Sequence, residues 1–265
     1  MTPAERASAV AFSYKNCELS GITPSDAMVE AANGYQRGTL GLADFVATPE
    51  RQAHRMNRQD TKQHGETRLR DDRIFARSVR LIDCDWPAVG GLEELKIIHR
   101  ALFVGAMPDA GMLRDDGHGS QNESSLTQGL PTKQKPLSNL YFPASLIETG
   151  AANIFSQLED ADHFFNLDRA AFIHALTGLY DELNTLHPFA YGNGMVLRIF
   201  ISELTHEVGW DLNWGTVTLG NYREATESAL HADTTRLERM FNAIIRPANP
   251  TRVFLISGWD QGPAH

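Results

Sequence analysis

Apolar residues recur at helical spacing through the middle of the chain. Residues 91–104 carry one apolar face, and residues 168–186 carry another, wider one. Asn166 and Asp168 are candidate N-caps for the second helix. Pro188 should end that helix, because proline disfavours the helical conformation at the residue before it. The pattern therefore predicts two long helices with buried faces.

Two further stretches complete this apolar centre. Residues 144–158 show helical spacing, and so do the residues between Met195 and Gly209. The aromatic run 140–143 resembles a strand, and the proline within it suits a sheet edge or a hairpin. We therefore expect a mostly α fold with a small β-hairpin.

The remaining segments have weaker patterns. Residues 57–90 are charged and low in periodicity, and residues 105–138 are rich in Gly, Pro, Asp and Ser, so both are predicted to be loops or irregular elements. The tail contains a β-like run at 252–256. Residues 1–56 are predicted to be helical, with Ser25 as a cap and Gly38 as a stop signal.

Composition narrows the class of partner. The 265 residues carry a net charge of −9, which makes DNA, RNA and anionic membranes poor electrostatic partners. The two cysteines, Cys17 and Cys84, lie in no metal-binding pattern, and no disulfide framework is expected. No secretory signal and no apolar run of the length of a membrane span is visible. We expect a cytoplasmic protein with no direct nucleic-acid or membrane partner.

The richest chemistry lies between the two central helices. His187 leaves a helix end, a glycine-rich turn follows at 192–194, and a new helix begins. The N–H groups of residues 192–196 would be unpaired at that helix start, and with the helix dipole they favour an anion such as phosphate. Arg198 lies one turn further on. A histidine beside such a cradle is a natural general base.

Residues 187–198 read HPFAYGNGMVLR and closely resemble the signature of the Fic (filamentation induced by cAMP) family, HxFx(D/E)GNGRxxR. The early helix at 95–103 and the segment at 140–147 also resemble parts of that family, so the resemblance covers about residues 90–240. It implies a Fic-fold helical bundle with a β-hairpin flap. The positions that match the signature are His187, Phe189, Gly192, Asn193, Gly194 and Arg198.

The resemblance also implies an activity, that of a protein adenylyltransferase, a nucleotidyltransferase that moves AMP from ATP to a Tyr, Ser or Thr hydroxyl of a target protein. His187 would deprotonate the acceptor, residues 192–194 would hold the phosphates, and Arg198 would bind the far phosphates. Phe189 would be structural. By analogy alone, the target would be a bacterial topoisomerase.

Other roles carried over from the family rest on less diagnostic spacing. The flap would pair with the target peptide in the manner of an added strand, and its residues would be Leu140, Tyr141, Phe142, Pro143 and Ala144. The adenine pocket would be lined by Asn221, Tyr222 and Ala225.

The signature departs from the family at two places. Tyr191 replaces the usual acidic metal ligand, so no metal ligand is assigned and the use of Mg²⁺ stays open. Met195 replaces the first arginine. Losing charge stabilisation at a phosphoryl centre slows transfer. The alternatives to a weakly active enzyme are a silent module that binds a nucleotide or a protein, and transfer of a different phosphate-linked group.

The first 56 residues resemble the small antitoxin that partners Fic toxins, here fused to a Fic domain at 57–265. The antitoxin's inhibitory glutamate pairs with the last arginine of the signature. The matching positions here are Asn16 and Ser20, before Gly21, so serine stands where the glutamate would be. The resemblance implies a toxin-like, autoinhibited protein in which the inhibitory residue is uncharged. The alternative is a pair of helices that only docks on the core.

Overall fold

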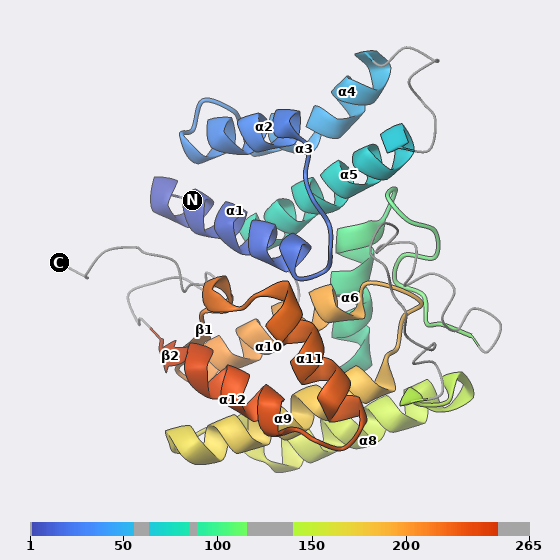
Figure 1. The fold of residues 1–265 in the computed structure, drawn as a ribbon, viewed down its shortest axis with the longest axis vertical. Helices are drawn as coiled ribbons and strands as arrows, with labels where there is room; N and C mark the ends of the chain where they lie inside the picture. Colours follow the sequence, from blue (N-terminus) through green and yellow to red (C-terminus); the bar gives the residue numbers. More distant parts are fainter. Residues whose placement is uncertain (1, 56–63, 85–88, 116–139, 249–265) are drawn as a thin grey trace.

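The computed structural model describes residues 2–55, 64–84, 89–115 and 140–248, and these are mostly helical (Figure 1). The single sheet in the described residues consists of β1 (Trp210–Leu212) and β2 (Ile245–Pro247), which pair antiparallel with Asp211 opposite Arg246. The expected mostly α class is confirmed, and the small sheet joins residues 210–212 to 245–247 and is not the hairpin expected near 140–143.

The N-terminal part lies in layers above the core (Figure 1). One layer holds α1 (Pro3–Glu18) and α5 (His64–Asp83), which pack against each other. The outer layer holds α2 (Asp26–Gln36), α3 (Leu42–Val46) and α4 (Thr48–Arg55). Of these elements, α1 extends toward the core at its C-terminal end.

The local signals of this part act as predicted. The Ser25 hydroxyl caps α2 by accepting from the Met28 N–H, and Gly38, two residues after the helix, has a φ of +75°. The Asp72 carboxylate accepts from both the N–H and the hydroxyl of Ser25, at 2.7 and 2.6 Å, and so joins α5 to the start of α2.

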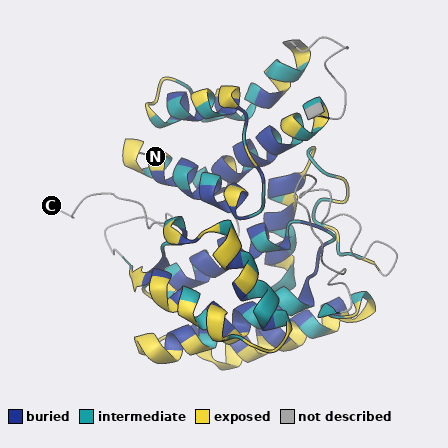
Figure 2. Ribbon diagram, in the orientation of Figure 1, coloured by how far each residue is buried: buried dark blue, intermediate teal, exposed yellow. Residues whose placement is uncertain are grey.

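The core is a helical bundle built on α6 (Gly91–Phe103), α9 (Arg169–Leu186) and α10 (Asn193–Glu207). Almost every residue in the first half of α10 is buried, and α6, α9 and β1 pack around it (Figure 2). The other helices surround these; they are α8 (Ile147–Asp160), α11 (Leu219–Leu230), α12 (Thr235–Ile244) and the short 3₁₀ turns η2 (Ala144–Leu146), η3 (Asp162–Phe164) and η4 (Trp214–Thr216).

The helix predicted over 168–186 is confirmed. Asp168 is its N-cap, and one carboxylate oxygen accepts from the N–H groups of Ala170 and Ala171. Figure 1 shows α9 beside α8, and the two pack together at the base of the core.

Two expectations about secondary structure are wrong. Residues 64–83, predicted to be irregular, form α5. The helical pattern was hidden because the buried face, which contains Ile74, Phe75 and Val79, is narrow and charged residues dominate the rest of the helix. Residues 140–143, predicted to be a flap strand, form no strand. The Phe142 N–H instead donates to the Thr185 carbonyl at 2.8 Å, so this segment runs along the end of α9.

The other half of the expected hairpin and the β-like run 252–256 lie outside the described residues. Among the helices that are described, none combines the length and the apolar character needed to cross a bilayer.

Candidate functional site

His187 ends α9 in a left-handed conformation, with φ 46° and ψ 61°. Pro188 forces the chain away from the right-handed helical region at this residue. The left-handed region costs a non-glycine residue about 1 kcal/mol or more, so surrounding contacts must hold His187 there. The side chain is buried, and its ring stacks on Tyr141 with centroids 3.7 Å apart and planes 14° apart.

Arg114, which sequence reasoning missed, joins three segments at this point. Its Nε donates to the His187 carbonyl at 2.6 Å, and its Nη2 donates to the carbonyls of Leu186, at 3.3 Å, and of Phe142. Its backbone N–H donates to the Pro188 carbonyl at 2.9 Å. The only sequence signal was a positive charge in a loop, which does not reveal so distant a partner.

The turn after His187 is closed by one side chain. Asn193 Oδ1 accepts from the Phe189 N–H at 3.0 Å, and Asn193 Nδ2 donates to the Phe189 carbonyl at 2.8 Å. Asn193 was predicted to be part of the anion cradle. Its side chain bonds the Phe189 backbone, so only its backbone N–H remains to bind an anion. The reciprocal pair fixes the position of His187 relative to the start of α10.

His99, on α6, packs against the turn that follows His187. Its ring stacks on Phe189 with centroids 4.0 Å apart. Its Nδ1 accepts from the Gly111 N–H at 2.8 Å, which leaves Nε2–H to donate to the Tyr191 carbonyl at 3.1 Å. Burial lowers the pKa of His99 to about 4. The imidazole is therefore neutral at physiological pH, and the two hydrogen bonds assign its tautomer.

The glycine turn leads into α10 as predicted, with one difference. Gly192 has a φ of +73°, and a Cβ there would lie 2.3 Å from the Phe103 ring, so only glycine fits. The N–H groups of Met195 and Val196, expected to be unpaired, donate to the Gly192 carbonyl at 3.0 and 3.2 Å. Among the described residues, the N–H groups of Asn193 and Gly194 have no acceptor, so they remain for an anion.

Arg198 lies one turn into α10 and is 0% exposed. Its Nε donates to Asn16 Oδ1 at 2.7 Å, and its Nη2 donates to the Asn16 carbonyl at 3.0 Å and the Ser20 hydroxyl at 2.5 Å. The third nitrogen, Nη1, lies 3.1 Å from the place that a Cβ on Gly194 would occupy. The guanidinium therefore sits between the glycine turn and the end of α1.

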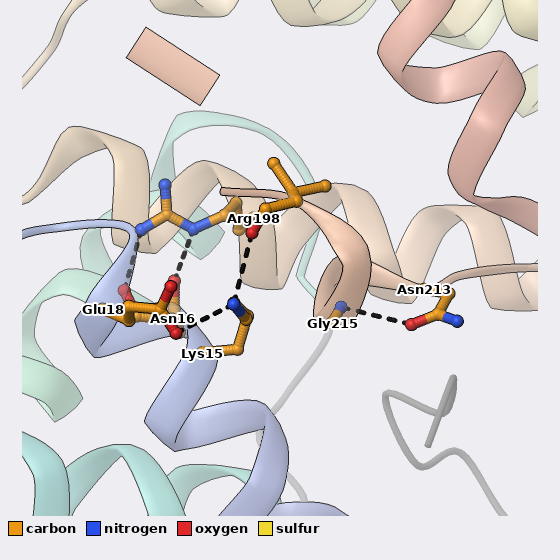
Figure 3. A network of polar contacts seen from close by, with 7 residues as sticks. Lys15, Asn16, Glu18, Arg198, Asn213 and Gly215 are labelled. Atoms are coloured by element: carbon orange, nitrogen blue, oxygen red, sulfur yellow. Dashed lines mark hydrogen bonds and ion pairs between the residues drawn. The ribbon is translucent and has the colours of Figure 1, made fainter. Parts of the chain in front are cut away.

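The end of α1 makes further polar contacts with the core (Figure 3). Asn16 Nδ2 donates to the Met195 carbonyl at 3.3 Å. Lys15 is buried, donates to the Val217 carbonyl at 3.2 Å and pairs with Glu18 at 2.8 Å. These bonds place α1 against both α10 and the turn before α11.

The three residues expected to line the adenine pocket differ in burial. Tyr222 is buried beside the arginine, whose guanidinium carbon lies 4.6 Å from the ring centroid, and its hydroxyl lies 2.6 Å from that of Tyr180. Ala225 is buried on the same face of α11, whereas Asn221 is exposed at the first turn. Tyr222 is thus the member of this set that contacts Arg198.

Both departures from the family signature are part of the apolar core. The Tyr191 side chain is 2% exposed, packs edge-on against Phe103, and donates its hydroxyl hydrogen to the Pro108 carbonyl. Burial raises the pKa of Tyr191, so it stays neutral. Met195 is 0% exposed. No group of three His, Cys, Asp or Glu in the described part of the chain is arranged to hold a metal ion.

Comparisons with known proteins show what this chain is similar to. The Fic/DOC family model matches residues 91–205. The protein named "Probable protein adenylyltransferase Fic" of Escherichia coli (strain K12) is 30% identical over 162 residues, which cover 61% of this chain and 73% of that protein. "Protein adenylyltransferase VbhT" of Bartonella schoenbuchensis is 33% identical over 100 residues, 38% of this chain and 20% of that protein.

Solved structures share the fold. The BepC protein of Bartonella tribocorum, solved with bound AMPPNP, has a TM-score of 0.58 at 17% identity and covers 73% of this chain and 97% of its own. An N-terminal Fic domain from Bartonella quintana, solved with bound ADP, has a TM-score of 0.59 at 19% identity and covers 72% of this chain and 89% of its own.

Proposed function

Because this chain belongs to the Fic/DOC family, we propose that it is a protein adenylyltransferase, which moves AMP from ATP to a hydroxyl side chain of a target protein. The observation that carries the proposal is the pair of hydrogen bonds between the Asn193 side chain and the Phe189 backbone, which joins the loop after His187 to the start of α10. Relatives named protein adenylyltransferases support the choice of AMP as the group transferred.

The chemistry follows from the positions of these groups. His187 accepts the proton of a Tyr, Ser or Thr hydroxyl, and the oxygen attacks the α-phosphorus of ATP. A new P–O bond forms, the bond to the β-phosphate breaks, and pyrophosphate leaves. The N–H groups of Asn193 and Gly194 and the positive end of the α10 dipole stabilise the phosphate charge, and Arg198 binds the phosphates beyond it.

Magnesium does not fit the residues at the signature's metal position. The Tyr191 hydroxyl donates its hydrogen to a backbone carbonyl, and a neutral phenol is a poor ligand for a hard cation. No step is therefore assigned to Mg²⁺. With Met195 in place of a second cation, we expect transfer to be slow compared with family members that have the full signature.

We further propose that α1 holds the enzyme in an inhibited state. A phosphate reaches Arg198 only if the guanidinium is accessible, and this one is fully covered by Asn16, Ser20 and the core. The acceptors are neutral oxygens, which bind a guanidinium less strongly than a carboxylate does. An inhibitory segment in the same chain has a high effective concentration, so weak contacts suffice to keep it docked on Arg198.

Residues 1–56 act as the antitoxin-like segment and 57–265 as the Fic domain of a cytoplasmic, toxin-like protein. Residues 140–144 bind the target, whose hydroxyl approaches His187 beside Tyr141. The adenine binds along α11, near Tyr222.

A second function is a silent module that binds a nucleotide or a protein without transfer. The burial of Tyr191 and Met195 favours it, because neither side chain can act on a phosphate from inside the core.

One experiment separates the two functions. The protein is incubated with a cell lysate and ATP labelled at the α-phosphate, beside a His187→Ala variant. Label on a lysate protein that depends on His187 supports transfer. ATP binding without any labelled protein, in a chain whose inhibitory α1 contact is weakened by Asn16→Ala, supports the silent module.

A further inference from the structure

The C-terminal end of α9 is an unusual place to hold a general base. The last carbonyls of a helix have no partner within it, and a left-handed residue that closes a helix is most often glycine. Here the closing residue is His187, which has a Cβ and therefore resists that conformation. Something outside α9 must stabilise both its free carbonyls and the conformation of His187.

Arg114 meets both requirements. Its guanidinium donates to the carbonyls of Leu186 and His187, the two at the helix end, where a cation is also favoured by the helix dipole. Its backbone N–H holds the next carbonyl, that of Pro188. Three consecutive carbonyl groups around the candidate base thus accept from this one residue.

The same guanidinium also fixes what lies over the histidine ring. Its Nη2 donates to the Phe142 carbonyl, and the residue before Phe142 is Tyr141, whose ring stacks on His187. The backbone below the imidazole and the ring above it are therefore both tied to Arg114. A planar fork with several donors can do this, whereas a single ammonium cannot reach all three carbonyls.

We infer that Arg114 is a positioning residue, which sets the orientation of the His187 imidazole through the end of α9 and through Tyr141. This inference rests on the proposed function only in that it takes His187 as the general base. It makes no claim that Arg114 touches ATP or the acceptor. A misplacement of a reacting group by about 1 Å can cost roughly a hundredfold in rate.

The test uses the full chain with Arg114→Gln and Arg114→Lys. The matched control is Arg169→Gln, at the other end of α9, where the guanidinium donates to the side chain and the carbonyl of Asn242 on α12. Both arginines hold a carbonyl acceptor of a neighbouring segment, so loss of stability alone affects both. Thermal unfolding confirms that each variant is folded.

The first readout is the proton NMR signal of the His187 ring, assigned with His187→Gln. Protons stacked above Tyr141 are shielded by its ring current, and Tyr141→Leu gives the unshielded reference. We expect Arg114→Gln to lose most of this shielding, Arg114→Lys to lose part of it, and Arg169→Gln to keep it. A His187 signal in folded Arg114→Gln and Arg114→Lys that matches the wild type overturns the inference.

The second readout is AMP transfer. We expect kcat to fall about a hundredfold in Arg114→Gln, with less loss in Arg114→Lys and little change in KM for ATP. A rise in KM with unchanged kcat would contradict positioning of the base. If the chain transfers nothing even with Asn16→Ala added to weaken the inhibitory contact, the proposed function fails, and the NMR signal alone then decides the inference.

Discussion

Asn16 offers the sharpest test of the inhibitory role of α1. Its side chain accepts from Arg198 Nε at 2.7 Å and donates to the Met195 carbonyl at 3.3 Å, both in a buried setting. Asn16→Ala removes these two bonds and keeps the backbone bond from Arg198 Nη2. The change therefore weakens the docking of α1 without altering any residue assigned to catalysis.

The size of the effect follows from the bonds that are lost. A hydrogen bond to a charged group contributes about 1.5–3 kcal/mol, and we take roughly 2 kcal/mol for the weaker docking of α1. Each 1.4 kcal/mol is about tenfold in an equilibrium, so the undocked population should rise about 30-fold. Because apparent affinity scales with the competent population, the Kd for nucleotide should fall by up to the same factor.

The assay is isothermal titration of the full chain with a non-cleavable ATP analogue. Ser8→Ala is the control, because Ser8 is buried on the same helix and its hydroxyl has no hydrogen-bond partner among the described residues. Hydrogen exchange reports whether α1 opens. If exchange in α1 rises in Asn16→Ala while the Kd stays that of the wild type, access to Arg198 does not limit binding and the reasoning is refuted.

Three further predictions concern the support of the site. Gly192→Ala should cost about 2–4 kcal/mol of unfolding free energy in urea titrations, whereas Gly178→Ala, with no atom within 4 Å of its Cβ, should gain up to about 1 kcal/mol; equal effects would contradict the packing argument. Because burial lowers the pKa of His99 to about 4 from its ordinary value of 6.5, the unfolded chain binds the extra proton between these values, and stability should fall by about 3 kcal/mol as pH drops from 6.5 to 4. A His99→Gln variant with the same pH dependence would show that another group is responsible. Tyr191→Phe should lower stability by about 1 kcal/mol and leave transfer within about twofold, since the hydroxyl points to the Pro108 carbonyl; a large loss of transfer would assign that hydroxyl a role in the reaction.

Local patterns predicted the parts of the fold that depend on local physics. The helix α9 has a wide apolar face, an aspartate cap and a proline after its last residue, and all three act within a few residues. The helix α5 was missed because burial by α1 and α6, which no local pattern records, stabilises its narrow apolar face. The segment 140–143 looks like a strand by composition, but its Phe142 N–H found a partner on α9.

In the candidate site, too, the residues close together in sequence were predicted and a residue with distant partners was missed. His187, the glycine turn and Arg198 lie within twelve consecutive residues, so the sequence alone brings them together. Asn16 and Ser20 contact Arg198, where resemblance to an antitoxin had placed them; their inhibitory role stays a prediction. Arg114 was missed because its partners are carbonyl groups, and a backbone acceptor leaves no trace in residue type.

The central claim is that this chain transfers AMP and that His187 is the base. The most direct measurement uses the Asn16→Ala chain and a target-containing lysate with ATP labelled at either the α- or the γ-phosphate. We predict that label from the α position appears on protein and is abolished by His187→Ala in the same background, and that label from the γ position, which lysate kinases also transfer, is the same with and without His187→Ala. A γ label that depends on His187, an α label that survives His187→Ala, or no α label from a chain that binds ATP would contradict the claim.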